Sequence, residues 1–338
     1  MTDTATERAQ ASPGGAFSHV LYPYVGREAF LQGLLAFIAE ARDADEAVVA
    51  AVPEAKRHAL RSALPPGAPV TFVDLAELGR NPARLIPAWQ EWVSTRTRDG
   101  QAVRGIEECA WPRCDAARTG ELRYHEWLLN LAFAQSPAWM LLCPYDTALA
   151  DESALLAMTR YHPTLWRDGT QVTSENYVDT AQPYPFGELA EPRAAVESMG
   201  YERGRLAAVR DKIAHWALAN RLAESRLRDL QVAASEVATN SILHAGGGGT
   251  LRVWVQDHTL VCEFSDSGFL KDPLAGRARP NPAQIGGRGL WLVHHLCDLV
   301  EVRSSPSDGT RIRLHMDLPS AGPAPAEPDG ATGTRRSP

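Results

Sequence analysis

The sequence predicts two units of different fold class: an N-terminal α/β unit with a parallel sheet, and a C-terminal α+β unit built of two layers. Between Phe17 and about His162, short continuous apolar runs alternate with segments of helical spacing. From about Arg203 onward, two helix-like segments precede strands in which polar and apolar residues alternate. This change of pattern along the chain indicates two separate cores.

Local patterns predict each element of the first half in turn. Apolar residues recur at helical spacing over 30–38. The apolar run 47–52 ends at Pro53, as a buried strand would. Further along, the patterns predict a strand at 70–73, a helix with Trp89 and Trp92, a helix over 121–133 and a strand at 139–143. Continuous apolar strands between helices are typical of a parallel sheet covered on both faces.

The second half is predicted to be helix, helix, two strands, loop, helix and two strands. Glycines 246–249 would end the second helix, and Asp257 and His258 suit a hairpin turn. The predicted elements are helices over 203–222, 224–243 and 289–297, and strands at 251–255, 260–264, 299–302 and 310–316.

Composition along the chain predicts the domain boundaries. Residues 1–16 and 319–338 are small, polar or rich in proline and glycine, which predicts disordered tails. We expect a first domain over 17–165, an irregular, proline-containing linker over 166–198, and a second domain over 199–318.

Overall composition excludes several classes of protein. The length of 338 residues suffices for two cores, and 44% hydrophobic residues exclude a collagen, a fully disordered chain and a disulfide miniprotein. The net charge of −7 argues against general nucleic-acid binding. No apolar run reaches the roughly 20 residues that span a bilayer, and the N-terminus lacks an apolar signal core. Five cysteines, an odd and sparse set, predict reduced thiols, so we expect a cytoplasmic protein that does not contact membranes.

The segment SEVATNSILHA at 235–245 carries the first candidate site. Glu236, Asn240 and His244 stand four residues apart and therefore share one face of the predicted helix. A carboxylate, an amide and an imidazole in this arrangement suit a hard cation with its waters, such as Mg²⁺. A solvated polar helix face is the alternative interpretation.

Two glycine-containing segments complete the pattern. In FSDSGF at 264–269, Asp266 follows a strand and precedes Gly268, which lets a ligand amine approach a carboxylate, although Asp-Ser-Gly is also an ordinary turn. In IGGRGLWLV at 285–293, glycines open a helix whose free N–H groups suit a phosphate. The sequence contains neither the phosphate-loop pattern nor a strand-linked GxGxxG.

The order and spacing of these three segments resemble the GHKL (Bergerat-fold) ATP-binding domain, in its RsbW-type anti-sigma-factor serine kinase branch. The resemblance covers about 203–318 and implies ATP and Mg²⁺ as cofactors. It implies that Asn240 binds Mg²⁺, that Glu236 acts as general base, and that Asp266, followed by Gly268, accepts a hydrogen bond from the adenine amino group.

The resemblance assigns further residues around the nucleotide. Gly287, Gly289 and Leu290 match the second glycine box, and Thr310 matches the threonine near adenine. Residues 271–285 would form the lid over the phosphates. The chain departs from the family at Phe269, where a second glycine is usual.

The roles of two polar side chains near the predicted phosphates are open. Arg288 either pairs with a phosphate or forms a surface salt bridge. His244 orients Glu236, or lines the phosphate side, or is a satisfied histidine at a helix end.

The implied activity is ATP-dependent phosphorylation of a serine or threonine on a partner protein, a sigma factor or an antagonist of an anti-sigma factor. Relatives of this branch are often dimers, so a homodimer is also expected. One alternative is an ATP-gated protein-binding module without turnover. Another is a sensor histidine kinase with His215 as phosphoacceptor, although His215 lacks the acidic residue and downstream proline of that motif and reads instead as a half-buried helix residue.

The first half resembles the MEDS sensory domain through FSHVLY at 17–22, YHEWLLN at 124–130 and LCPYD at 142–146, with Cys109 and Cys114. The resemblance implies a RecA-like α/β core without a phosphate loop, which senses an unidentified small ligand or binds a partner and regulates the second domain.

The sequence allows more than one role for several polar and thiol groups of this half. His19, Cys109, Cys114 and Cys143 would suit a metal site or a redox pair, but cysteines are commonly buried small hydrophobes. Glu126 and Asn130 lie one helical turn apart, on a cleft wall or, as we expect, on a solvated face.

Overall fold

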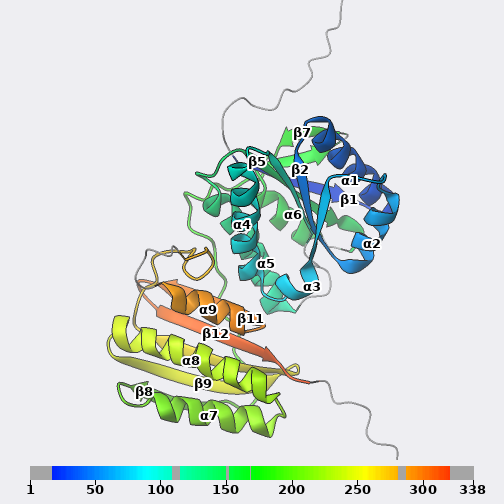
Figure 1. The fold of residues 1–338 in the computed structure, drawn as a ribbon. Helices are drawn as coiled ribbons and strands as arrows, with labels where there is room; N and C mark the ends of the chain where they lie inside the picture. Colours follow the sequence, from blue (N-terminus) through cyan, green and yellow to red (C-terminus); the bar gives the residue numbers. More distant parts are fainter. Residues whose placement is uncertain (1–16, 109–114, 150–151, 168, 281–286, 320–338) are drawn as a thin grey trace, which may run out of the picture.

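The computed structural model describes residues 17–108, 115–149, 152–167, 169–280 and 287–319. The predicted N-terminal tail and nearly all of the predicted C-terminal tail lie outside these ranges. Two domains follow one another along the chain, each with its own sheet (Figure 1). None of the helices within the described ranges is long and apolar enough to span a bilayer.

The first domain is built on a seven-stranded sheet of order β3-β2-β4-β5-β1-β6-β7. All neighbouring strands are parallel except β6 and β7, so the predicted parallel sheet is confirmed, with one antiparallel edge. The strands are β1 (Phe17–Tyr24), β2 (Ala47–Val52), β3 (Val70–Asp74), β4 (Val103–Glu107), β5 (Trp139–Asp146), β6 (Thr164–Arg167) and β7 (Thr170–Thr173).

Helices cover both faces of this sheet (Figure 1). They are α1 (Gly26–Asp43), α2 (Glu54–Ala63), α3 (Leu75–Leu78), α4 (Leu85–Arg98), α5 (Ala116–Ala132) and α6 (Glu152–Tyr161). Val20 and Leu21 are consecutive in β1 yet belong to two different buried clusters, because successive side chains of a strand point to opposite faces. Burial on both faces explains the continuous apolar strands in the sequence.

The second domain has two layers, as the sequence predicts. Its antiparallel sheet has the order β11-β12-β10-β9-β8, with three helices on one face (Figure 1). The elements are β8 (Glu197–Glu202), α7 (Leu206–Ala219), α8 (Glu224–His244), β9 (Gly248–Gln256), β10 (Thr259–Asp266), α9 (Arg288–Leu296), β11 (Leu299–Ser305) and β12 (Gly309–Asp317). Asp257 and His258 form the β9–β10 turn with φ of 50° and 59°, a conformation that Asp tolerates.

Some strands escape the sequence patterns. Strand β4 contains Gly105, where a Cβ would lie 2.8 Å from the Trp89 ring. This tight packing favours glycine, and glycine is uncommon in strands, so the sequence pattern of β4 does not indicate a strand. Strands β6 and β7 occupy part of the stretch expected to be irregular, since its prolines fall before and after them. The predicted domain boundaries at 165 and 199 stay predictions.

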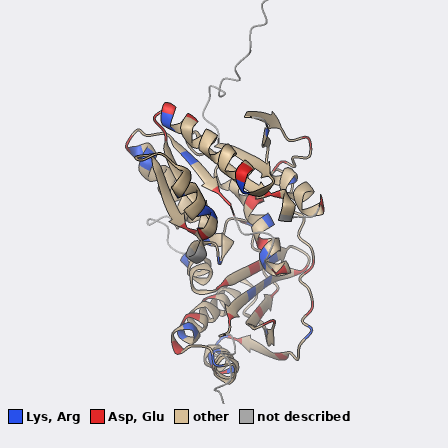
Figure 2. Cartoon of the chain, turned by 90° about the vertical axis from the view of Figure 1, so that its right-hand side faces the viewer, with Lys and Arg blue, Asp and Glu red and all other residues tan. Residues whose placement is uncertain are grey.

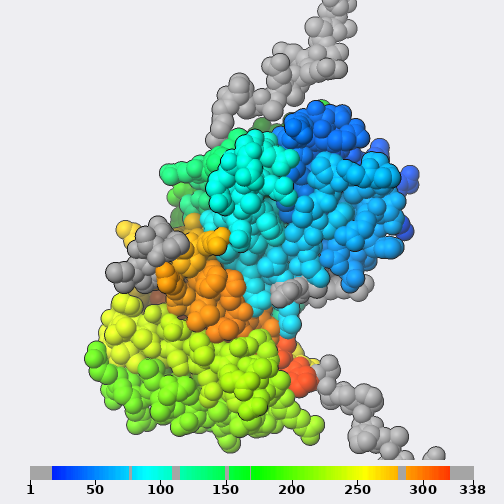
Figure 3. Space-filling view, in the orientation of Figure 1, coloured from blue at the N-terminus to red at the C-terminus, as the bar shows by residue number. Residues whose placement is uncertain are grey.

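The end of α9 is held by the first domain. Arg84 donates to the carbonyl oxygens of His294, His295 and Cys297 at 3.1, 2.8 and 2.8 Å, and Asn81 donates to that of His294 at 2.8 Å. A cation at the C-terminus of a helix satisfies carbonyls that lack intrahelical partners. Figure 3 shows this region packed against the first domain, and Figure 2 shows acidic and basic residues interspersed over both domains.

Candidate functional site

Helix α8 carries the first predicted segment, with its apolar residues in the core. Glu236 and Asn240 are half-buried, whereas His244, the last residue of the helix, is exposed. Gly287 precedes α9 with φ of 78°, and a Cβ on Gly289 would lie 2.7 Å from Glu236 Oε2 and 3.5 Å from Asn240 Nδ2. The glycines therefore let the N-terminus of α9 approach the polar face of α8.

The Asp266 carboxylate is fixed at the end of β10. Its Oδ2 accepts a hydrogen bond from Ser241 Oγ at 2.6 Å, and its Oδ1 accepts one from the Gly268 N–H at 2.9 Å. The Tyr201 hydroxyl donates to Ser241 Oγ at 2.9 Å, and burial raises the pKa of Tyr201 to about 12, which keeps the donor protonated at neutral pH. This chain of hydrogen bonds orients the carboxylate before any ligand binds.

The loop after Asp266 is tied to the end of β11 and the start of β12. Thr310 Oγ1 donates to the Gly268 carbonyl oxygen at 2.8 Å, and the Leu270 N–H donates to Ser304 Oγ at 2.8 Å. A Cβ on Gly309, whose φ is 77°, would lie 2.1 Å from the Asp266 carbonyl oxygen. Only glycine therefore permits this close approach of the two segments.

These segments surround a cavity of about 480 Å³, within the size range of small-ligand sites. Eight of the ten predicted site residues line it: Asn240, His244, Asp266, Gly268, Gly287, Gly289, Leu290 and Thr310. Glu236 lies behind Gly289, and Arg288 is the exposed first residue of α9, so neither is among the lining residues.

Comparison with known proteins assigns both domains. Residues 18–163 match the family model of the MEDS domain (MEthanogen/methylotroph, DcmR Sensory domain), and residues 201–316 match that of the histidine kinase-like ATPase domain. The chain combines a MEDS domain with a histidine kinase-like ATPase domain. Both resemblances inferred from the sequence are thus confirmed at the level of the domain.

Other comparisons are more distant. The RsbU and RsbW domains of Rv1364c from Mycobacterium tuberculosis match with 17% identity and a TM-score of 0.27, over 37% of this chain and 32% of that chain. The match thus spans about a third of that structure. No curated protein matched the sequence.

Residues 271–280, the described part of the predicted lid, form one wall of the ATPase cavity and also contact the MEDS domain. A Cβ on Gly276 would lie 2.6 Å from Leu290 Cβ, so the segment lies directly against α9. The neighbouring Arg277 is buried and forms an ion pair with the buried Glu121 of α5. The rest of the predicted lid, 281–285, lies outside the described residues.

A second set of contacts supports this ion pair. The Tyr124 hydroxyl donates to the Pro273 carbonyl oxygen at 3.2 Å, and the Arg277 guanidinium lies 4.9 Å from the Tyr124 ring centroid. Arg303 of β11 also donates to Glu121, at 2.9 Å. Sequence reasoning missed these residues, because no local pattern links a helix of one domain to a loop of the other.

Phe269 occupies the position where the family pattern has glycine. Its side chain is 51% exposed and lines the ATPase cavity. It also lines a second cavity of about 980 Å³, which lies between the two domains. The departure from the family pattern therefore places an aromatic ring at the mouth of the predicted nucleotide site.

The structure brings together some of the polar residues predicted in the MEDS domain. Cys143 Sγ and His19 Nε2 lie 3.3 Å apart, whereas Cys109 and Cys114 lie outside the described residues. Glu126 is only 2% exposed, so the prediction of a solvated face is wrong for it: α5 turns this carboxylate toward the sheet. His162, directly after α6, joins the same cluster, although nothing in its local sequence marks it.

Proposed function

We propose that this protein is an ATP-binding protein kinase whose ATPase domain is regulated by the MEDS domain. The oriented Asp266 carboxylate at a cavity of about 480 Å³ carries the ATP assignment. Asp266 is already held by two donors, and it retains lone pairs for an adenine amino group. Glycines and the residues that begin α9 also line the cavity, which supports a ligand that carries phosphate groups.

Mg²⁺ fits the oxygen and amide groups at this site. Asn240 would hold it, and the ion would neutralise charge on the phosphates. The backbone N–H groups that begin α9, next to Gly287 and Gly289, would bind phosphate oxygens. Together these groups position the terminal phosphate against the polar face of α8.

Glu236 is proposed as the general base that accepts the proton of a serine or threonine hydroxyl on a partner protein. Within the described part of the chain, the Glu236 carboxylate has no ion-pair partner, which supports its availability. The proposed partner is a sigma factor or an antagonist of an anti-sigma factor. A pull-down with and without ATP, followed by mass spectrometry, would identify it.

The test is transfer of labelled phosphate from ATP to that partner. Glu236→Gln should abolish transfer while nucleotide binding persists. The control is Glu224→Gln, since Glu224 lies on the same helix with a side chain that is 83% exposed. Equal labelling by the wild-type and Glu236→Gln proteins would show that Glu236 is not the base. Asp266→Asn should instead abolish nucleotide binding in calorimetry, with the exposed turn variant Asp257→Asn as control.

A non-catalytic, ATP-gated binding module is the second candidate, and the exposed Phe269 ring at the cavity favours it. Nucleotide would then shift the populations of two conformations with different partner affinity. Nucleotide binding that Asp266→Asn removes, without product from any partner over hours, would support the module over the kinase.

His215 of α7 is exposed rather than half-buried, so it is accessible to chemistry. A base-stable phosphorylated protein that His215→Gln abolishes would favour a sensor histidine kinase.

Regulation is proposed to pass through the 271–280 segment. This segment lines the cavity, and Glu121 and Tyr124 of the MEDS helix α5 hold it through Arg277 and Pro273. A displacement of α5 would therefore change the cavity wall directly. Through this physical link, ligand binding in the MEDS domain would change the nucleotide affinity of the ATPase domain.

A further inference from the structure

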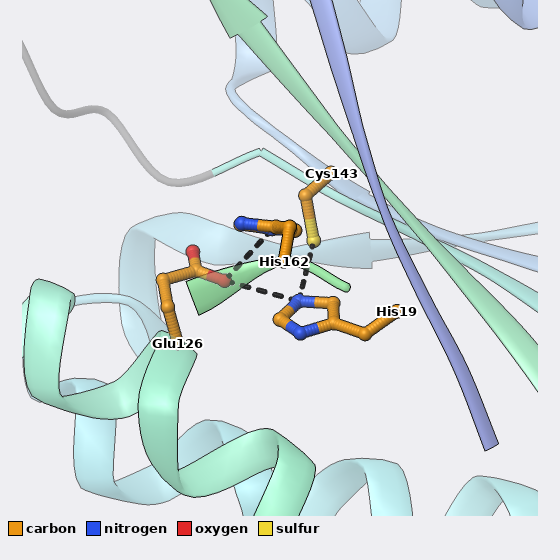
Figure 4. Close-up of side chains that lie close together, drawn as sticks. All are labelled: His19, Glu126, Cys143 and His162. Atoms are coloured by element: carbon orange, nitrogen blue, oxygen red, sulfur yellow. Dashed lines mark hydrogen bonds and ion pairs between the residues drawn. The ribbon is translucent and has the colours of Figure 1, made fainter. Parts of the chain in front are cut away.

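The MEDS domain encloses a cluster of four buried side chains that the proposed ATP chemistry does not use (Figure 4). His19 comes from β1, Glu126 from α5, Cys143 from β5 and His162 from the residue after α6. One ligand atom of each lies within 4.8 Å of those of the other three. All four residues are buried, so bulk solvent does not reach these polar atoms.

The separations match a tetrahedral metal centre. Glu126 Oε2 lies 3.2 Å from His19 Nε2 and 3.4 Å from His162 Nε2, and Cys143 Sγ lies 3.3 Å from His19 Nε2. Tetrahedral zinc has bonds of about 2.0–2.3 Å, which places neighbouring ligand atoms roughly 3.3–3.7 Å apart. These three separations are therefore close to the edge lengths of one coordination tetrahedron around a zinc ion.

Hydrogen bonds outside the cluster set the tautomers of both imidazoles. Asn130 Nδ2 donates to the carbonyl oxygens of Tyr161 and Glu126 at 2.7 and 3.2 Å, which leaves Asn130 Oδ1 to accept from His19 Nδ1 at 3.1 Å. His162 Nδ1 donates to a carbonyl oxygen of α6 at 2.9 Å. Both Nε2 atoms thus present lone pairs to the cluster, as metal-binding histidines do.

Two of the inward-facing atoms lack a hydrogen-bond partner among the described residues. They are Glu126 Oε2 and His162 Nε2. Buried polar atoms without partners are costly, and a cation bound by both of these atoms would remove that cost.

We propose that His19, Glu126, Cys143 and His162 bind one zinc ion. Two imidazoles, a thiolate and a carboxylate suit zinc, whereas Mg²⁺ and Ca²⁺ prefer oxygen ligands throughout. Binding converts the Cys143 thiol to a thiolate, and its proton passes to solvent. Four protein ligands leave no open position, so the ion is structural and joins β1, β5, α5 and the chain before β6. Glu121 lies five residues before Glu126 on α5, so the ion also steadies the helix that contacts the 271–280 segment.

The first test is the metal content of the untagged full-length protein, produced with zinc in the medium and measured by elemental analysis. We expect one equivalent of zinc per chain, and a higher melting temperature than that of protein refolded with a chelator. Wild-type protein that folds without zinc and takes up none on refolding with Zn²⁺ would overturn the proposal.

The second test uses Co²⁺ as a spectroscopic probe of the same site. Protein refolded with Co²⁺ should show the strong visible bands of a tetrahedral site and a thiolate-to-cobalt charge-transfer band. Cys143→Ser should lose the charge-transfer band, and His162→Gln should bind Co²⁺ at least tenfold more weakly. Cys262→Ser, which alters a buried cysteine of the ATPase domain, is the matched control and should leave the spectrum unchanged. Identical spectra for Cys143→Ser and wild type would refute Cys143 as a ligand and with it the proposed site.

Discussion

Replacing Glu121 with glutamine should release the 271–280 segment from the MEDS domain. Glu121 is fully buried and accepts from Arg277 and Arg303, while Arg277 is only 2% exposed. The variant keeps the shape of the side chain but leaves the Arg277 guanidinium as an uncompensated buried charge. The segment can restore hydration to that charge only by leaving α5.

The magnitude follows from the burial of the pair. Removing one partner of a buried ion pair costs about 3–5 kcal/mol. Each 1.4 kcal/mol changes an equilibrium constant by about tenfold. The opening equilibrium of the segment should therefore rise by about 10²- to 10³-fold.

Hydrogen exchange measured by mass spectrometry reports this opening. The Ala275, Arg277 and Ala278 N–H groups donate to backbone carbonyls within the segment at 3.1, 2.8 and 3.2 Å, so their exchange requires the turn to open. Peptides covering 271–280 should exchange about 100-fold faster or more in Glu121→Gln. Peptides from β9 and β10 should be unchanged if the fold is intact.

The chain offers a matched control in Glu91→Gln. Glu91 also belongs to the MEDS domain and pairs with Arg279 of the same segment at 3.3 Å, but both side chains are about 60% exposed. An exposed pair contributes about 0–1 kcal/mol, so exchange should change by less than about fivefold. Equal protection in Glu121→Gln and Glu91→Gln would refute the idea that the buried pair holds the segment. A double-mutant cycle with Arg277→Met should show strong non-additivity.

Three further predictions concern the ATPase domain. Gly289→Ala places a Cβ 2.7 Å from Glu236 Oε2, so the Glu236 carboxylate must shift. Phosphate transfer to the partner should fall while nucleotide affinity in calorimetry changes little, and unchanged transfer would contradict the proposed role of Glu236. Ser241→Ala removes the donor to Asp266 Oδ2, and hydrogen bonds to charged groups contribute about 1.5–3 kcal/mol, so nucleotide affinity should fall about tenfold or more by the same measurement. Burial, Arg277, His295 and Arg84 lower the pKa of His294 well below its usual value. The folded state then binds fewer protons than the unfolded state below about pH 6.5, so stability in urea should fall as pH falls below that value. His294→Leu should make this dependence shallower without abolishing it, because the pKa values of His19, His162 and His295 are lowered as well; an unchanged slope would contradict the prediction.

Local sequence signals predicted most of the residues that line the cavity of the ATPase domain. Glu236, Asn240 and His244 share a face of α8 because four residues make about one helical turn, whatever lies around the helix. Gly268 packs against Ala245, Gly287 has a φ of 78°, and Gly289 lies against the Glu236 side chain, so the glycine positions mark this cavity. Continuous apolar runs likewise predicted the parallel sheet, because both of its faces are buried.

Tertiary structure decided the features that join distant parts of the chain. Glu121 and Arg277 are 156 residues apart, and neither neighbourhood indicates a buried ion pair. On its helix Glu126 reads as a solvated carboxylate, yet packing against β1 and β5 buries it beside His19, Cys143 and His162. Spacing along one element determines which side chains share a face. Whether water or another element covers that face depends on long-range packing, which local sequence does not encode.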